Sequence, residues 1–122
     1  MKPSLDPPDR YSFYRSLLEP IRAAARGCGY AVGVHGSEIR DFDLIAAPWV
    51  EDAKPADDLA RAVADAVGGH ILVKHEGALY GVKPLGRRVY TIVWDGPVEE
   101  RYPHPDNWAV FIDMSVAHGV RA

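Results

Sequence analysis

Residues 35–48 read HGSEIRDFDLIAAP, and this stretch decides the fold that the chain predicts. The preceding run, YAVGV at residues 30–34, is short, apolar and bounded by glycines, which indicates a buried strand. Residues 35–40 predict a turn, and residues 41–47 predict a second strand that Pro48 closes. Because a parallel crossover needs a dozen or more residues, these two strands should pair antiparallel.

Helical patterns flank the two strands. Apolar residues at helical spacing across residues 11–28 predict a helix, which Pro20 should kink or split into two. A second helix is expected from Pro55, and the glycines at 68 and 69 should end it. Further strands are expected at residues 71–74, 88–94 and 108–116, with a glycine-rich hairpin at 77–86 and a polar loop at 95–107.

The predicted order is helix, two strands, helix and then further strands. This order indicates an α+β fold, with the helices packed on one face of a mixed, mostly antiparallel sheet. Residues 1–10 contain three prolines and no apolar periodicity, so they predict a flexible lead-in. Residues 11–122 predict a single domain.

Composition narrows the class of protein. The chain has 122 residues and a formal net charge of −3, which gives no reason to expect broad binding to nucleic acid or to anionic membrane, although a local basic pocket fits. A single cysteine precludes an internal disulfide and suits a reducing compartment. The sequence has no signal-peptide pattern and no apolar run of about 18 residues, so we expect a cytoplasmic protein without a membrane partner.

Two aspartates in the second predicted strand carry the first chemical signal. Asp41 and Asp43 are two residues apart, so their carboxylates should share one face of the strand. Two like charges this close cost stability unless a cation lies between them, and oxygen ligands of this kind suit Mg²⁺. Asp113 lies in the apolar run VFIDMSV, where a buried charge needs a partner. That partner could be an arginine, backbone amides, or the metal ion that Asp41 and Asp43 would bind.

The pattern of Gly36-Ser37, then Asp41 and Asp43, then Asp113 resembles the nucleotidyltransferase superfamily of DNA polymerase β. The resemblance implies two metal ions, Mg²⁺ or Mn²⁺, held by the three aspartates, with Asp113 as the catalytic residue beside the attacking hydroxyl. It also implies that the Gly-Ser turn holds a nucleoside triphosphate. The implied reaction transfers a nucleoside monophosphate to a hydroxyl acceptor on an RNA, a protein or a small molecule.

Basic residues could hold the triphosphate. Arg40 follows the Gly-Ser turn closely enough to contact phosphate. Of the later basic residues Lys74, Lys83, Arg87 and Arg88, we favour Lys74 and Arg88 because they border predicted strands. The acceptor-binding domain that usually accompanies the family's catalytic domain does not fit in this length, so we expect a partner protein or a homodimer to supply that surface.

A second hypothesis remains open. Only three residues separate Ser37 from Asp41, which is fewer than is usual in the family. The chain could therefore be an inactive binding module with the same fold, such as a phage or mobile-element accessory or inhibitor protein. Its contact surface would then lie around Trp49, Tyr102 and Trp108 rather than at the aspartates.

Overall fold

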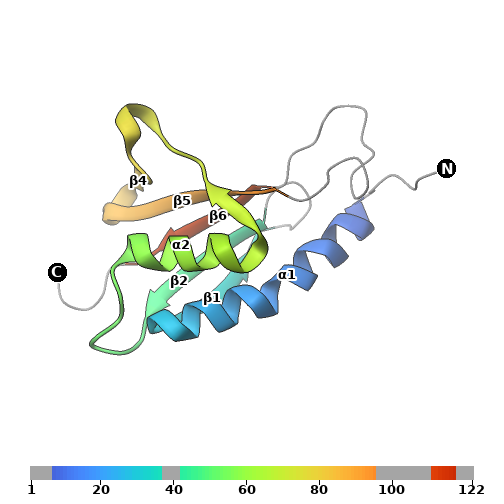
Figure 1. Cartoon of the computed structure of the whole chain (residues 1–122), viewed down its shortest axis with the longest axis horizontal. Coiled ribbons are helices and arrows are strands. Elements are labelled where there is room, and N and C mark those ends of the chain that lie inside the picture. The colour runs from blue at the N-terminus through green and yellow to red at the C-terminus, as the bar shows by residue number, and fades with distance from the viewer. Residues whose placement is uncertain (1–6, 37–41, 96–110, 118–122) are drawn as a thin grey trace.

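The computed structural model describes residues 7–36, 42–95 and 111–117 of the chain. Within these residues, two α-helices lie on one face of a six-stranded mixed sheet, so the predicted α+β class is confirmed (Figure 1). Two short 3-10 turns interrupt the segment between the third and fifth strands. The elements in chain order are α1 (Pro7–Cys28), β1 (Tyr30–His35), β2 (Phe42–Pro48), α2 (Ala56–Val67), β3 (Gly69–Ile71), a 3-10 turn (His75–Gly77), β4 (Gly81–Lys83), a second 3-10 turn (Pro84–Gly86), β5 (Arg87–Trp94) and β6 (Phe111–Val116).

The sheet brings distant parts of the sequence together. Its strands follow the order β1-β2-β6-β5-β3, and β4 pairs with the beginning of β5. β1 and β2 are antiparallel neighbours, as the short turn between them predicts. β2 and β6 are parallel, and the other pairs among the described strands are antiparallel. The last strand therefore lies in the middle of the sheet, between β2 and β5.

The core fills the space between the helices and one face of the sheet. On β2, Phe42 and Leu44 are fully buried, and the ring of Phe42 stacks on Tyr14 of α1 at 5.0 Å between centroids. On β6, Ile112 and Met114 are likewise fully buried. Because side chains alternate along a strand, the residues between these core positions point to the open face of the sheet. Asp43 and Asp113 are such residues.

α1 begins earlier than predicted. Its first residue is Pro7, inside the segment expected to be a lead-in, whereas residues 1–6 lie outside the described part of the chain. Of the two outcomes expected at Pro20, a kink or a split, the split does not occur, because the helix continues through this residue. Proline removes one backbone donor, but Leu18 and Ile21 on either side of it are buried in the core. Packing of the apolar face therefore outweighs the missing hydrogen bond.

The strands after α2 also differ from prediction in their bounds. Gly68 adopts the left-handed conformation, with φ 71°, and ends the helix as expected. β3 then begins at once with Gly69, which pairs with Trp94, so the strand lies at 69–71 rather than 71–74. β5 begins at Arg87, one residue earlier than predicted. Residues 108–110 of the last predicted strand lie outside the described residues, and β6 covers its remainder.

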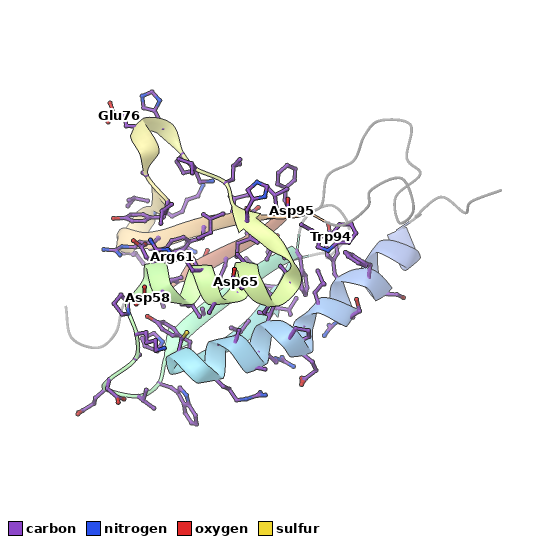
Figure 2. The ribbon with its side chains drawn as sticks, in the orientation of Figure 1. Asp58, Arg61, Asp65, Glu76, Trp94 and Asp95 are labelled. Atoms are coloured by element: carbon purple, nitrogen blue, oxygen red, sulfur yellow. The ribbon has the colours of Figure 1, made fainter. Side chains whose placement is uncertain are left out.

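The outer surface of the helical layer is polar. Figure 2 shows Asp58, Arg61 and Asp65 on α2, and all three are exposed. Arg61 donates a hydrogen bond to Asp58 over 3.2 Å, one turn of helix away. In the part of the chain that the structure describes, neither helix is long and apolar enough to cross a membrane.

Candidate active site

One row of side chains crosses four strands on the open face of the sheet. His35 of β1 lies opposite Asp43 of β2, and Asp43 lies opposite Asp113 of β6. Asp113 in turn lies opposite Thr91 of β5. Side chains of directly opposed residues stand on the same face, so the row places two carboxylates side by side between an imidazole and a hydroxyl.

A cavity of about 580 Å³ opens over this row. This volume lies within the range of roughly 300–1,000 Å³ that small-molecule sites usually have. The lining combines the row with residues from the neighbouring segments: His35, Asp43, Lys74, Gly81, Lys83, Arg87, Val89, Thr91, Asp113 and Ser115. One side of the cavity is therefore acidic, and the side formed by β4 and the start of β5 is basic.

A chain of hydrogen bonds connects the two sides. The ammonium of Lys74 donates to the hydroxyl oxygen of Thr91 over 2.7 Å. The same hydroxyl donates to Oδ1 of Asp113 over 2.9 Å. The threonine thereby orients the Asp113 carboxylate. The Lys74 ammonium polarises the hydroxyl that donates to this carboxylate. Charge-assisted hydrogen bonds of this kind are among the stronger ones in proteins.

Basic side chains gather where β4 pairs with β5. Lys83 lies opposite Arg87 in the antiparallel register, and both line the cavity. Arg87 donates to the hydroxyl of Ser115 on β6 over 3.4 Å, which directs its guanidinium across the open face. Guanidinium and ammonium groups placed opposite carboxylates can hold the phosphates of a nucleotide, while the carboxylates hold a cation.

Gly36 lies against Asp43, next to the acidic end of the cavity. Its φ is +83°, a conformation that favours glycine, and it follows directly after β1. A Cβ atom at this position would lie 2.9 Å from Oδ2 of Asp43. The absence of a side chain at Gly36 is therefore what allows the turn to lie against the aspartate.

The donor set partly fits a divalent cation. Asp43 and Asp113 supply hard oxygen ligands from adjacent strands, as Mg²⁺ requires. Among the residues that the structure describes, no group of three or more histidine, cysteine, aspartate or glutamate side chains could hold a metal ion. The third predicted ligand, Asp41, lies outside the described residues, as do Ser37 and Arg40 of the predicted nucleotide site.

Four of the predicted site residues lie together and one lies apart. Asp43, Asp113 and Lys74 line the cavity, and Gly36 adjoins Asp43. Arg88 does not line the cavity: its guanidinium lies over the ring of Tyr80, 4.5 Å from the centroid. Its hydrogen bond with Tyr90 raises the pKa of Arg88 further. These contacts assign Arg88 a packing role.

The sequence prediction missed several cavity residues for a physical reason. Tyr90 and Ile92 face the core, so alternation places Arg87, Val89 and Thr91 on the open face and turns Arg88 toward the helices. The apolar residues Tyr90 and Ile92, two positions apart, were a sign in the sequence of which residues of this strand face the core. No signal in the sequence marks His35 and Ser115, which depend on the pairing of distant strands.

Comparison with known proteins gives no matching family model and no match among curated proteins. The inferences about function therefore depend on the residues and geometry of this chain.

Proposed function

We propose that the protein is a metal-dependent nucleotidyltransferase that transfers a nucleoside monophosphate from a nucleoside triphosphate to a hydroxyl acceptor. The observation that carries the proposal is the pairing of Asp43 with Asp113 in one row, facing a cavity whose other wall is basic. Two carboxylates opposite each other favour a cation between them, and a basic wall favours an anionic ligand. A metal–triphosphate complex has both features.

The residues take distinct roles in this reaction. The acceptor oxygen bonds to the α-phosphorus as the bond to the bridging oxygen breaks, and pyrophosphate leaves. The Asp113 carboxylate, held by Thr91, accepts the hydroxyl proton, while Lys74, Lys83 and Arg87 hold the phosphates. Two bound Mg²⁺ or Mn²⁺ ions would neutralise the charge that develops on the entering and leaving oxygens.

The acceptor is a hydroxyl of an RNA, a protein or a small molecule. A second copy of this chain or a partner protein supplies the surface that binds it. Asp41, Ser37 and Arg40 complete the proposed site as the third carboxylate and the phosphate-binding turn.

The test is binding and turnover in one set of variants. We expect calorimetry to detect binding of each nucleoside triphosphate in the presence of Mn²⁺ or Mg²⁺, and label from the α-phosphate to move onto an acceptor with release of pyrophosphate. Asp43→Asn should abolish the metal-dependent part of both signals. Asp65→Asn removes an exposed carboxylate of α2 and should leave both signals unchanged. An unaltered metal response in Asp43→Asn would sink the proposal.

The alternative is a binding module that retains the fold without the reaction. It is favoured by the lack of a three-ligand group among the described residues. Binding of a nucleoside triphosphate without release of pyrophosphate from it, whichever acceptor is present, would support this alternative.

A further inference from the structure

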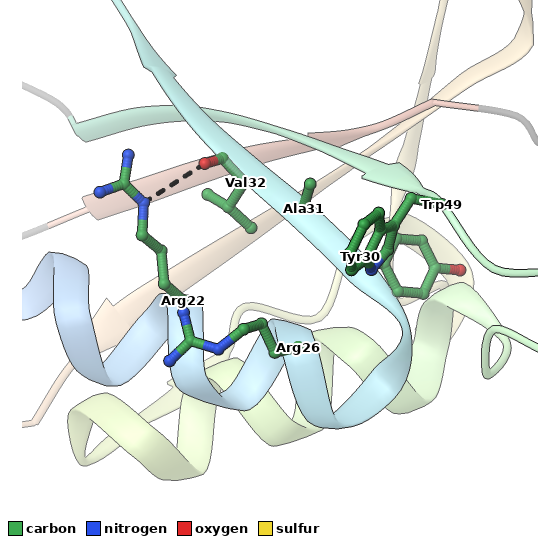
Figure 3. Close-up of a pocket in the computed structure, with 6 residues that line it drawn as sticks. All are labelled: Arg22, Arg26, Tyr30, Ala31, Val32 and Trp49. Atoms are coloured by element: carbon green, nitrogen blue, oxygen red, sulfur yellow. Dashed lines mark hydrogen bonds between the residues drawn. The ribbon is translucent and has the colours of Figure 1, made fainter.

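A second pocket lies on the helical side of the sheet, at the outer edge of β1 (Figure 3). Its volume is about 230 Å³, which is below the usual range for a drug-sized ligand and suits one small planar group. It is lined by Arg22 and Arg26 of α1, by Tyr30, Ala31 and Val32 of β1, and by Trp49 after β2. None of these residues belongs to the cavity over Asp43 and Asp113.

The charge of this pocket is positive. Arg22 and Arg26 are four residues apart, so their side chains project from the same face of α1 one turn apart. Among the described residues, neither guanidinium has an ion-pair partner. Arg26 is exposed, and its guanidinium is available for a bidentate contact with an anion. In a chain with a net charge of −3, this is a local basic site.

An aromatic side chain completes the pocket. Trp49 is 70% exposed, which is unusual for the largest apolar side chain. The ring of Tyr30 lies in the same lining, but its hydroxyl is already used, because it donates to the carbonyl of Lys54 over 2.7 Å. The indole face of Trp49 is thus the surface on which a planar ligand can stack.

The backbone edge of β1 is partly covered. The amide of Trp49 donates to the carbonyl of Gly29, so alternate residues from Gly29 direct their backbone groups toward β2. The carbonyl of Val32 therefore points outward, and Nε of Arg22 donates to it over 3.5 Å. This guanidinium lies across the edge where an added peptide strand would have to pair, which disfavours strand addition. Its two terminal nitrogens remain for a ligand.

We propose that this pocket binds an unpaired nucleotide, with the base stacked on Trp49 and the phosphate held by Arg22 and Arg26. Stacking on an aromatic side chain tolerates any base, and guanidinium groups match phosphate oxygens in geometry. The nucleotide can be free or part of a single strand, since both have the same chemistry. This pocket does not depend on the proposed transferase reaction, because it shares no residue with that site.

The test uses the full chain in EDTA, so that metal-dependent binding at the other cavity does not contribute. The probe is a fluorescein-labelled single-stranded hexauridine with a 5′-phosphate, and the measurement is fluorescence anisotropy at low salt. Trp49→Ala and Arg26→Ala should each raise the Kd about 5-fold or more, as expected for the loss of one stacked base or one phosphate contact. Trp49→Phe and Arg26→Lys should recover part of the affinity.

Matched controls distinguish this pocket from charge alone. Arg61→Ala removes an exposed helical arginine elsewhere, and Asp65→Asn removes an exposed carboxylate of α2, and neither should change the Kd. Competition by free uridine monophosphate would identify a mononucleotide ligand, whereas its failure to compete would identify a segment of a strand.

Three results would overturn the proposal. They are no binding of the probe, a Kd that neither Trp49→Ala nor Arg26→Ala changes in variants with unaltered thermal unfolding, and equally tight binding of an oligoglutamate peptide.

Discussion

At the residue scale, Gly36 lies against the Asp43 carboxylate at the acidic end of the cavity. Its backbone is left-handed, which strains any other residue, and a Cβ atom there would lie 2.9 Å from Oδ2 of Asp43, so that carboxylate would have to shift. Gly36→Ala should therefore lower the free energy of unfolding by about 1–2 kcal/mol. It should also displace the Asp43 carboxylate and weaken Mn²⁺ binding. Urea unfolding measures the first effect, and calorimetry with Mn²⁺ measures the second.

Gly33 provides the matched control for this substitution. It lies in β1, and a Cβ there would meet no atom within 4 Å. Gly33→Ala should leave Mn²⁺ binding intact and leave stability unchanged or raised by up to about 1 kcal/mol. Equal metal affinity in the two variants would mean that Gly36 does not position Asp43.

At the scale of elements, a partly buried hydrogen bond joins the sheet to α2. The hydroxyl of Tyr90 on β5 donates to Asp57 in the first turn of the helix over 2.6 Å. Burial and this hydrogen bond, in that order, raise the pKa of Tyr90 well above its usual value near 10. A tyrosine whose pKa is raised on folding contributes stability that is complete below pH 10. That contribution is lost as pH rises from about 10 toward the higher pKa of the folded state.

Tyr90→Phe should therefore change both the level of stability and its dependence on pH. We expect a loss of about 1–2 kcal/mol at pH 7, because the Asp57 carboxylate loses a donor. Above pH 10, the decline in stability should be shallower in the variant than in the unaltered protein. Urea unfolding between pH 7 and 11 measures both effects. Tyr80→Phe is the control, since Tyr80 contacts Tyr90 and Arg88 through its ring, and loss of its hydroxyl leaves the hydrogen bond of Tyr90 with Asp57 in place.

Periodicity and turn residues predicted which elements form, and packing decided where they begin and end. The short link after β1 correctly predicted an antiparallel pair, and Gly68 correctly marked the end of α2. The sequence left open whether Pro20 would kink or split α1, and core contacts made by residues on both sides of it keep the helix whole. The predicted strand began at Arg88 instead of Arg87. Arg88 was therefore favoured as the phosphate ligand at this strand border, although its side chain packs on Tyr80 and Arg87 lines the cavity.

At the scale of the whole molecule, topology assembles the site from separate strands. Asp43 and Asp113 meet because β6 inserts between β2 and β5, a placement that no local pattern encodes. Two arguments from the sequence linked these aspartates: the family resemblance, and the need of a buried charge for a partner. The strand register places them opposite each other. Thr91 and Ser115 join the site through the same insertion.

Asp43 and Asp113 place two like charges opposite each other on adjacent strands. Carboxylates directly opposite each other on neighbouring strands repel, by about 0.2–1 kcal/mol relative to a neutral pair. Asp113→Asn removes one charge and keeps an oxygen that can accept from Thr91. Without metal, the variant should therefore be more stable than the unaltered protein by about that amount.

Bound metal should reverse the order of stability of Asp113→Asn and the unaltered protein. A cation that binds only the folded state stabilises it by about 2.7 kcal/mol at a concentration one hundred times its Kd. The unaltered protein should gain this stability with Mn²⁺ and Asp113→Asn should not, so their thermal unfolding temperatures should exchange rank between EDTA and Mn²⁺. Asp65→Asn on α2 should follow the unaltered protein in both conditions. If Asp113→Asn is instead the less stable protein in EDTA, the Asp113 carboxylate serves the fold through Thr91 and Lys74 rather than a metal.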